Sequence, residues 1–246
     1  MKKTHLLYLS CLLLFFTSCG KTSVDCFSDP GTVESIIRIP DSTFTGIEMY
    51  NNIDVDLVAS NFAQIELIGG NKLLDAITTE VEDNKLILRN TSECNFLRSS
   101  DRPLKAIIYY TQLDSLIYRS NGNLTTLGAI KSDQFKIDIF EGSGKISLIL
   151  NTSKSYLNYH FGTADLLVEG SSNVNYIYQV SYGPIDARQL NTQYTYLESR
   201  SPNNCFVKSN LSLEATINGP GNVYFTGNVQ NPVLSGSGSG KLLRLE

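Results

Sequence analysis

The sequence predicts an all-β protein, folded as a parallel β-solenoid in a single domain. The composition favours strands and turns over helices, because Tyr, Ile, Thr, Asn and Gly are abundant while Lys and Glu are few. Apolar residues alternate with period two through the second half of the chain, without helical spacing. In the same half a short turn motif recurs at nearly constant intervals, which is typical of a stacked repeat.

The turn motif consists of Gly or another small residue, any residue, Gly or a similar residue, and then Asn, Asp or Lys. Its copies start at Ser120, Gly142, Gly162, Gly183, Ser201, Gly219 and Gly238, which places successive starts 18 to 22 residues apart. Glycine suits such corners because it adopts positive φ at little steric cost. We therefore expect the corners of the stack at Gly142, Gly144, Gly219, Gly221, Gly238 and Gly240.

Two short alternating runs follow each turn motif. The first run after Gly144 places Ile146, Leu148 and Leu150 on one face, and the second places Leu157, Tyr159 and Phe161 on one face. One such unit cannot bury its apolar face alone, whereas units stacked at about 4.8 Å can. A β-sandwich or a propeller would also accommodate strands of this length, but the regular turn motif favours the solenoid.

The region from Thr32 to Asn90 is rich in strands but less regular. Residues 43–49, 53–58 and 64–68 are expected strands, and residues 71–77 are expected to contain one helical turn capped by Asn71. Residues 80–89 predict two strands joined by a tight turn at Asp83 and Asn84.

The N-terminus has the pattern of a bacterial lipoprotein signal. Lys2 and Lys3 precede a short apolar run, and small residues then lead to Cys19, the expected site of lipid attachment. An ordinary secretory peptide is the alternative. We expect a signal peptide over residues 1–18, a lipid-anchored tether over 19–31 and the solenoid over 32–246. Gly20 is not the Asp that commonly retains lipoproteins in the inner membrane, so the outer membrane is favoured, with the leaflet left open.

The remaining cysteines suit an oxidising compartment outside the inner membrane. Cys26 and Cys94 are the candidate disulfide pair, whereas Cys205 lies in an alternating run and is expected to be a small buried thiol.

The chain resembles the putative auto-transporter adhesin family with the head GIN domain, common as lipoproteins in Bacteroidota. The resemblance rests on the lipobox, on residues 53–57, on the stretch 90–98 around Cys94, and on residues 219–228 with 238–241. It implies a β-helix of pectin-lyase-like shape, which we expect to be right-handed, and a role in adhesion. No catalytic residues come with it, and the turns at Gly162 and Gly183 depart from the Gly-Ser-Gly pattern of the family.

Charge and residue counts exclude several functions. A formal net charge of −4 argues against nucleic-acid binding, which needs a concentrated basic surface. Loss of the signal peptide would leave His160 as the one histidine, and we expect it to face solvent. A single histidine with scattered cysteines provides neither a catalytic triad nor a zinc site. We therefore predict no cofactor and no metal.

A polysaccharide-active β-helix hydrolase or lyase is the main alternative to a non-catalytic protein. A hydrolase needs two carboxylates facing one bond, but the adjacent pair Glu82 and Asp83 falls at the expected hairpin turn. Asp54 and Asp56 share one strand face and could bind Ca²⁺, but the solvated side of a strand is the favoured explanation.

Tyrosines supply the candidate ligand site. Tyr194 and Tyr196 would face outward beside Tyr156 of a nearby unit if Leu197 is buried, forming a surface on which a sugar could stack. Aromatic stacking in a ladder or in the core of the solenoid is the favoured interpretation, with the sugar-binding surface as the functional one. The sequence thus predicts an envelope lipoprotein whose solenoid binds a glycan or protein ligand without catalysis, or serves only a structural role; its oligomeric state stays open.

Overall fold

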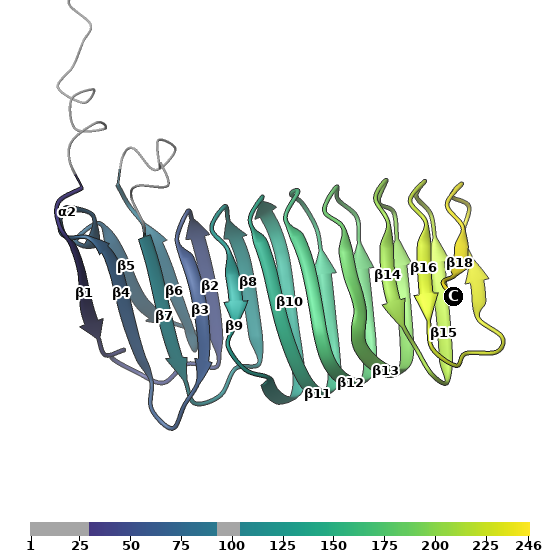
Figure 1. Cartoon of the computed structure of the whole chain (residues 1–246), viewed down its shortest axis with the longest axis horizontal. Coiled ribbons are helices and arrows are strands. Elements are labelled where there is room, and N and C mark those ends of the chain that lie inside the picture. Colours follow the sequence, from purple (N-terminus) through teal and green to yellow (C-terminus); the bar gives the residue numbers. More distant parts are fainter. Residues whose placement is uncertain (1–29, 93–103) are drawn as a thin grey trace, which may run out of the picture.

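The computed structural model describes residues 30–92 and 104–246, which form one elongated stack of strands (Figure 1). Strands make up 64% of these described residues, helix is almost absent from them, and the stack has about 6 turns. The predicted all-β, single-domain solenoid is confirmed. Cys19, Cys26 and Cys94 lie outside the described residues, so lipid attachment and the disulfide stay predictions.

The strands run almost perpendicular to the long axis of the molecule (Figure 1). In chain order they are β1 (Val33–Arg38), β2 (Gly46–Asn51), β3 (Asp54–Ala59), β4 (Gln64–Gly70), β5 (Ile77–Glu82), β6 (Lys85–Asn90), β7 (Leu104–Tyr110), β8 (Ser115–Ser120), β9 (Leu124–Thr126), β10 (Ile130–Gly142), β11 (Lys145–Tyr159), β12 (Asp165–Gln179), β13 (Ile185–Ser199), β14 (Cys205–Lys208), β15 (Ser212–Ile217), β16 (Val223–Thr226), β17 (Val233–Ser235) and β18 (Leu242–Arg244).

Parallel pairing builds the repeat from β8 onward. The long strands β11, β12 and β13 each bend and contribute to both sides of the stack (Figure 1). They pair in parallel, with Leu157 beside Ile177 and Ile177 beside Leu197. After β13 the two sides are formed by separate strands, since β14 continues its first half and β15 its second. We call the outward side of β2, β6, β8, β15, β17 and the second halves of β10 to β13 the tyrosine face.

The N-terminal end departs from the parallel pattern. β4 pairs antiparallel with β1 and β7, and β5 pairs antiparallel with β6. The β5–β6 turn has positive φ at Asp83 and Asn84, as its sequence predicts. The helical turn α2 (Asn71–Leu74) begins one residue earlier than expected: Gly70 is its N-cap residue and no side chain caps it, so the prediction of Asn71 as the cap was wrong.

The core consists of the inward residues of both sides. Ile146, Leu148, Leu150, Leu157 and Tyr159 are buried as predicted. Phe161, however, is 68% exposed. β11 ends at Tyr159 and the chain turns at Gly162 with φ of +110°, so the inward alternation stops before Phe161 reaches the core.

The turn glycines are required mainly by close packing of one turn on the next. Of the six predicted corner glycines, Gly142 alone has positive φ. A Cβ on Gly144 would lie 2.3 Å from the Gly122 carbonyl oxygen, and one on Gly240 would lie 2.0 Å from that of Gly221. Gly219, Gly221 and Gly238 meet the preceding turn in the same way. The corners are glycine because backbone approaches backbone there, which corrects the expectation of positive φ.

Polar side chains in the interior hold the turns in place. The Tyr118 hydroxyl donates to the Gly122 carbonyl at 2.8 Å, and the Tyr159 hydroxyl donates to the Ala164 carbonyl at 2.8 Å. Burial raises the pKa of both tyrosines, so they stay protonated donors. Cys205 is fully buried, as predicted, and burial also raises the pKa of its thiol.

Candidate ligand-binding site

Three tyrosines form a stacked ladder on the tyrosine face. The ring centroids of Tyr156 and Tyr176 are 4.9 Å apart with an interplanar angle of 9°, and those of Tyr176 and Tyr196 are 5.3 Å apart at 18°. The ladder follows from the pairing register, in which Tyr156 lies beside Tyr176 and Tyr176 beside Tyr196. The residues next to each tyrosine in its strand are buried, for example Thr195 and Leu197 on either side of Tyr196, so the three rings point outward.

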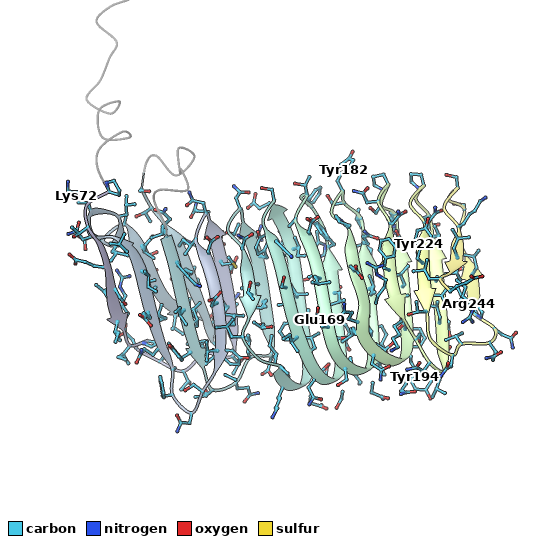
Figure 2. The ribbon with its side chains drawn as sticks, in the orientation of Figure 1. Lys72, Glu169, Tyr182, Tyr194, Tyr224 and Arg244 are labelled. Atoms are coloured by element: carbon cyan, nitrogen blue, oxygen red, sulfur yellow. The ribbon has the colours of Figure 1, made fainter. Side chains whose placement is uncertain are left out.

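Of the three predicted tyrosines, Tyr156 and Tyr196 belong to the ladder, on either side of Tyr176, and Tyr194 does not. Tyr176, the central ring, is not among the predicted tyrosines, although its spacing of 20 residues from both Tyr156 and Tyr196 is a signal for it in the sequence. Tyr194 pairs with Val174 rather than with a ring. Figure 2 shows Tyr194 at the lower edge of the stack. The glycine turns form the opposite, upper edge, from which Tyr182 projects. Because the rings cover one another, they do not form a continuous flat platform.

An open hollow of about 320 Å³ lies at the end of this ladder. It is at the small end of the range of about 300–1,000 Å³ for ligand sites. Residues of four neighbouring strands of the tyrosine face line it: Asn158, Tyr176, Ile177, Tyr178, Tyr196, Leu197, Glu198, Glu214 and Thr216.

Two glutamates give the hollow its charge. Glu214 pairs with Tyr196 in register, and Glu198 pairs with Thr216, so the acids lie diagonally on adjacent strands of one face. Glu198 accepts hydrogen bonds from Arg200, with an Nη2 to Oε1 distance of 2.8 Å. Glu214 is exposed. The sequence does not indicate this pair of acids, because 16 positions separate them along the chain.

A second row of rings runs beside the ladder. The rings of Phe140 and His160 stack at 4.5 Å, and His160 meets Tyr178 at 5.8 Å. His160 is half-buried, and its Nε2 lies 3.1 Å from Asp138 Oδ1. The structure thus holds His160 against a carboxylate and a ring, rather than leaving it to face solvent freely.

Asp138 is the centre of a polar cluster next to the ladder. Burial disfavours its charge, but hydrogen bonds from Lys136, His160 and Asn158 outweigh that effect, so the pKa of Asp138 lies below its ordinary value. Lys136 Nζ is 2.9 Å from Asp138. This lysine is therefore engaged within the sheet face.

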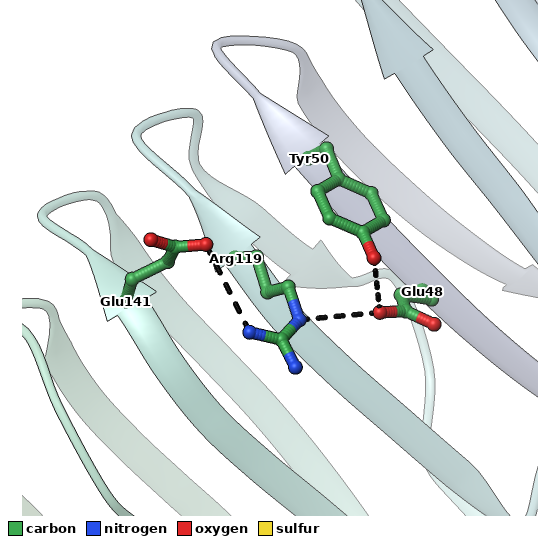
Figure 3. Close-up of polar contacts among 4 residues, drawn as sticks. All are labelled: Glu48, Tyr50, Arg119 and Glu141. Atoms are coloured by element: carbon green, nitrogen blue, oxygen red, sulfur yellow. Dashed lines mark hydrogen bonds and ion pairs between the residues drawn. The ribbon is translucent and has the colours of Figure 1, made fainter.

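Arg119 continues the second row toward the N-terminal end. Figure 3 shows its guanidinium between Glu48, 3.2 Å away, and Glu141, 3.9 Å away, while the Tyr50 hydroxyl donates to Glu48 at 2.6 Å. Its Cζ also lies 4.3 Å from the ring centroid of Phe140. This network joins β2 of the irregular region to β8 and β10 of the repeat.

The other acidic candidates do not form a site. Asp56 pairs with Lys105 at 2.5 Å, and Asp54 accepts a hydrogen bond from the Asn123 backbone at 2.8 Å. Glu82 and Asp83 lie at the β5–β6 turn. Over residues 30–92 and 104–246, no group of three or more His, Cys, Asp or Glu side chains could hold a metal ion.

The fold and the outward ladder define a parallel β-solenoid with an open aromatic and acidic surface. Its sequence matches the family model described as "Putative auto-transporter adhesin, head GIN domain" over residues 43–229. The chain belongs to this family, as its motifs indicated. Among curated proteins, none matches this chain.

Solved structures share the fold. A putative adhesin of Bacteroides fragilis matches with a TM-score of 0.75 and 17% identity, covering 87% of this chain and 97% of that one. A putative adhesin of Parabacteroides merdae matches at 0.61 and 17%, covering 88% and 97%. A putative lipid binding protein of Parabacteroides distasonis matches at 0.64 and 18%, covering 88% and 98%. In the described part of this chain, no helix is long and apolar enough to span a membrane.

Proposed function

We propose that this protein is a lipoprotein adhesin of the bacterial outer membrane whose solenoid binds a glycan without catalysing a reaction. In this proposal residues 1–18 are removed, Cys19 carries the lipid and residues 19–31 tether the solenoid. Membership of the adhesin family supports the adhesive role. The observation that carries the ligand class is the hollow at the end of the tyrosine ladder.

The lining of the hollow suits a polyhydroxylated ligand. The hydroxyls of Tyr176 and Tyr178 and the carboxylates of Glu198 and Glu214 provide hydrogen-bonding groups beside aromatic rings. Sites of this kind combine aromatic walls with a few polar groups that fix orientation. An acyl chain would gain little from these polar groups, so the lining favours a sugar over the lipid class named for the P. distasonis neighbour.

The two glutamates also raise the hydrolase alternative, since glycosidases use a carboxylate pair. One carboxyl of such a pair must donate a proton. Arg200 donates hydrogen bonds to Glu198 Oε1, so this carboxylate is engaged by a neighbouring side chain rather than free to face a scissile bond. We therefore favour binding without turnover.

A soluble form that starts at Gly20 tests this function, and it retains every described strand because β1 begins at Val33. We expect it to be retained by one or more members of an immobilised glycan panel and to release no product from them. Product formation would overturn the non-catalytic assignment. Retention by phospholipid vesicles without glycan binding would overturn the glycan assignment.

The anchor is tested separately on the full chain expressed in a bacterial host. Mass spectrometry should find an acylated N-terminal Cys19 in the membrane fraction, and the Cys19→Ala variant should leave that fraction. An unmodified mature N-terminus would contradict the lipoprotein assignment.

A further inference from the structure

We infer that the hollow selects uncharged sugar rings and rejects acidic ones, a specificity that rests on the proposed glycan-binding function. The inference follows from an open ring face, two carboxylates and the lack of basic residues among the lining.

The open ring face belongs to Tyr196. One face of its ring is covered by Tyr176 at 5.3 Å. On the next strand the paired position is Glu214, which carries no ring, and no aromatic ring of the described residues stacks on the other face. A pyranose presents C–H groups on one side of its ring, and these pack well against an exposed aromatic face. Tyr156, at the other end of the ladder, is paired with Lys136 and does not line the hollow. Tyr196 is thus the end ring that a sugar in the hollow would meet.

The carboxylates lie where the hydroxyls of such a sugar would be. Glu198 and Glu214 both line the hollow next to Tyr196. Hydrogen bonds from hydroxyls to a charged carboxylate are stronger than those between neutral groups. A uronic acid or a sulfated sugar would instead bring a second negative charge against these groups, and like charges brought together in an interface oppose binding.

Nothing in the lining offsets that repulsion. The nine lining residues include no Lys and no Arg. Arg200, directly after β13, is paired with Glu198 at 2.8 Å, and Lys136 on β10, the strand beside β11, is paired with Asp138 at 2.9 Å. The Glu214 carboxylate therefore sets the charge preference of the hollow.

The test compares a neutral oligomer of glucose with a matched oligomer of glucuronic acid, by isothermal titration at low salt with the Gly20 form. We expect the neutral oligomer to bind at least tenfold more tightly. Glu214→Gln should weaken neutral binding about tenfold, because a charged hydrogen bond is replaced by a neutral one, and Glu214→Lys should confer binding of the acidic oligomer. Glu169→Gln is the matched control, since Glu169 lies on the first half of β12, away from the tyrosine face (Figure 2).

The outcomes separate this inference from the proposed function. Equal or tighter binding of the acidic oligomer, or neutral binding unchanged in Glu214→Gln, overturns the charge selectivity and leaves glycan binding in place. Failure of every sugar in the panel, neutral and acidic, overturns the proposed function itself.

Discussion

Tyr196 and Glu214 occupy paired positions on neighbouring parallel strands, and the change from tyrosine to glutamate between them ends the aromatic ladder. The end of the ladder exposes a ring face next to a carboxylate. At the other end of the ladder Tyr156 is paired with Lys136 and does not line the hollow, so the proposed ligand-binding site lies at Tyr196.

Removing the ring of Tyr196 should abolish most of the glycan binding. We expect Tyr196→Ala to lower affinity at least tenfold for any glycan that the wild type retains, measured by isothermal titration. Tyr194→Ala should stay within twofold of the wild type, because Tyr194 is 37% exposed but does not line the hollow. Equal losses in the two variants would argue that the site extends along β13.

A methyl group at the turn glycines should destabilise the stack. Gly144→Ala places a Cβ 2.3 Å from the Gly122 carbonyl oxygen, so the turns must move apart. We expect a loss of about 1–3 kcal/mol in the free energy of unfolding, measured by urea denaturation. Gly128→Ala is the control, since nothing lies within 4 Å of its Cβ position. A neutral Gly144→Ala would show that turn packing is not required.

The Tyr159 hydroxyl should contribute to stability through the turn that it holds. Tyr159→Phe leaves the Ala164 carbonyl without this 2.8 Å hydrogen bond in a buried position. The expected cost is about 1–3 kcal/mol. Tyr182→Phe, at an exposed ring on the turn edge, should change the free energy of unfolding by less than about 0.5 kcal/mol. Similar values for both variants would refute the role of the interior hydroxyl.

Asp138 should make stability depend on pH in the acidic range. Its pKa is lower in the folded than in the unfolded protein. Its contribution to the free energy of unfolding is therefore complete above the pKa of the unfolded state and is lost as pH falls through the pKa of the folded state. The difference in unfolding free energy between the wild type and Asp138→Asn should therefore shrink on acidification below about pH 4. A difference that is constant from neutral pH down to pH 2 would contradict this assignment.

The thiol of Cys205 should be inert while the protein is folded. It is fully buried and burial raises its pKa, so both access and thiolate formation are suppressed. Alkylation by iodoacetamide at pH 8, followed by mass spectrometry of the Cys205 peptide, should be slow in buffer and fast in denaturing urea. Fast labelling of the folded protein would show that this end of the solenoid opens readily.

The local pattern of the sequence was sufficient for the architecture. Period-two alternation placed Ile146, Leu148 and Leu157 in the core, and the recurring turn motif distinguished a solenoid from a sandwich. The alternation could not place Phe161, because the strand ends two residues before it. Nor could it reveal the antiparallel pairing of β1, β4 and β7, which depends on contacts between segments far apart in the chain.

The candidate site shows most clearly what the sequence by itself determined and what only the tertiary structure decided. Alternation determined which residues of one strand share a side, so that Tyr196 lies opposite Leu197 and Glu214 opposite Leu213 and Ala215. Which residue lies beside each of them on the next strand depends on the number of residues in each turn of the solenoid. The offset between paired residues is 20 from Tyr176 to Tyr196 but 18 from Tyr196 to Glu214. An offset of 20 would have placed Thr216 beside Tyr196. Register between strands, which the packing of the turns sets, brought the carboxylate to the end of the ladder.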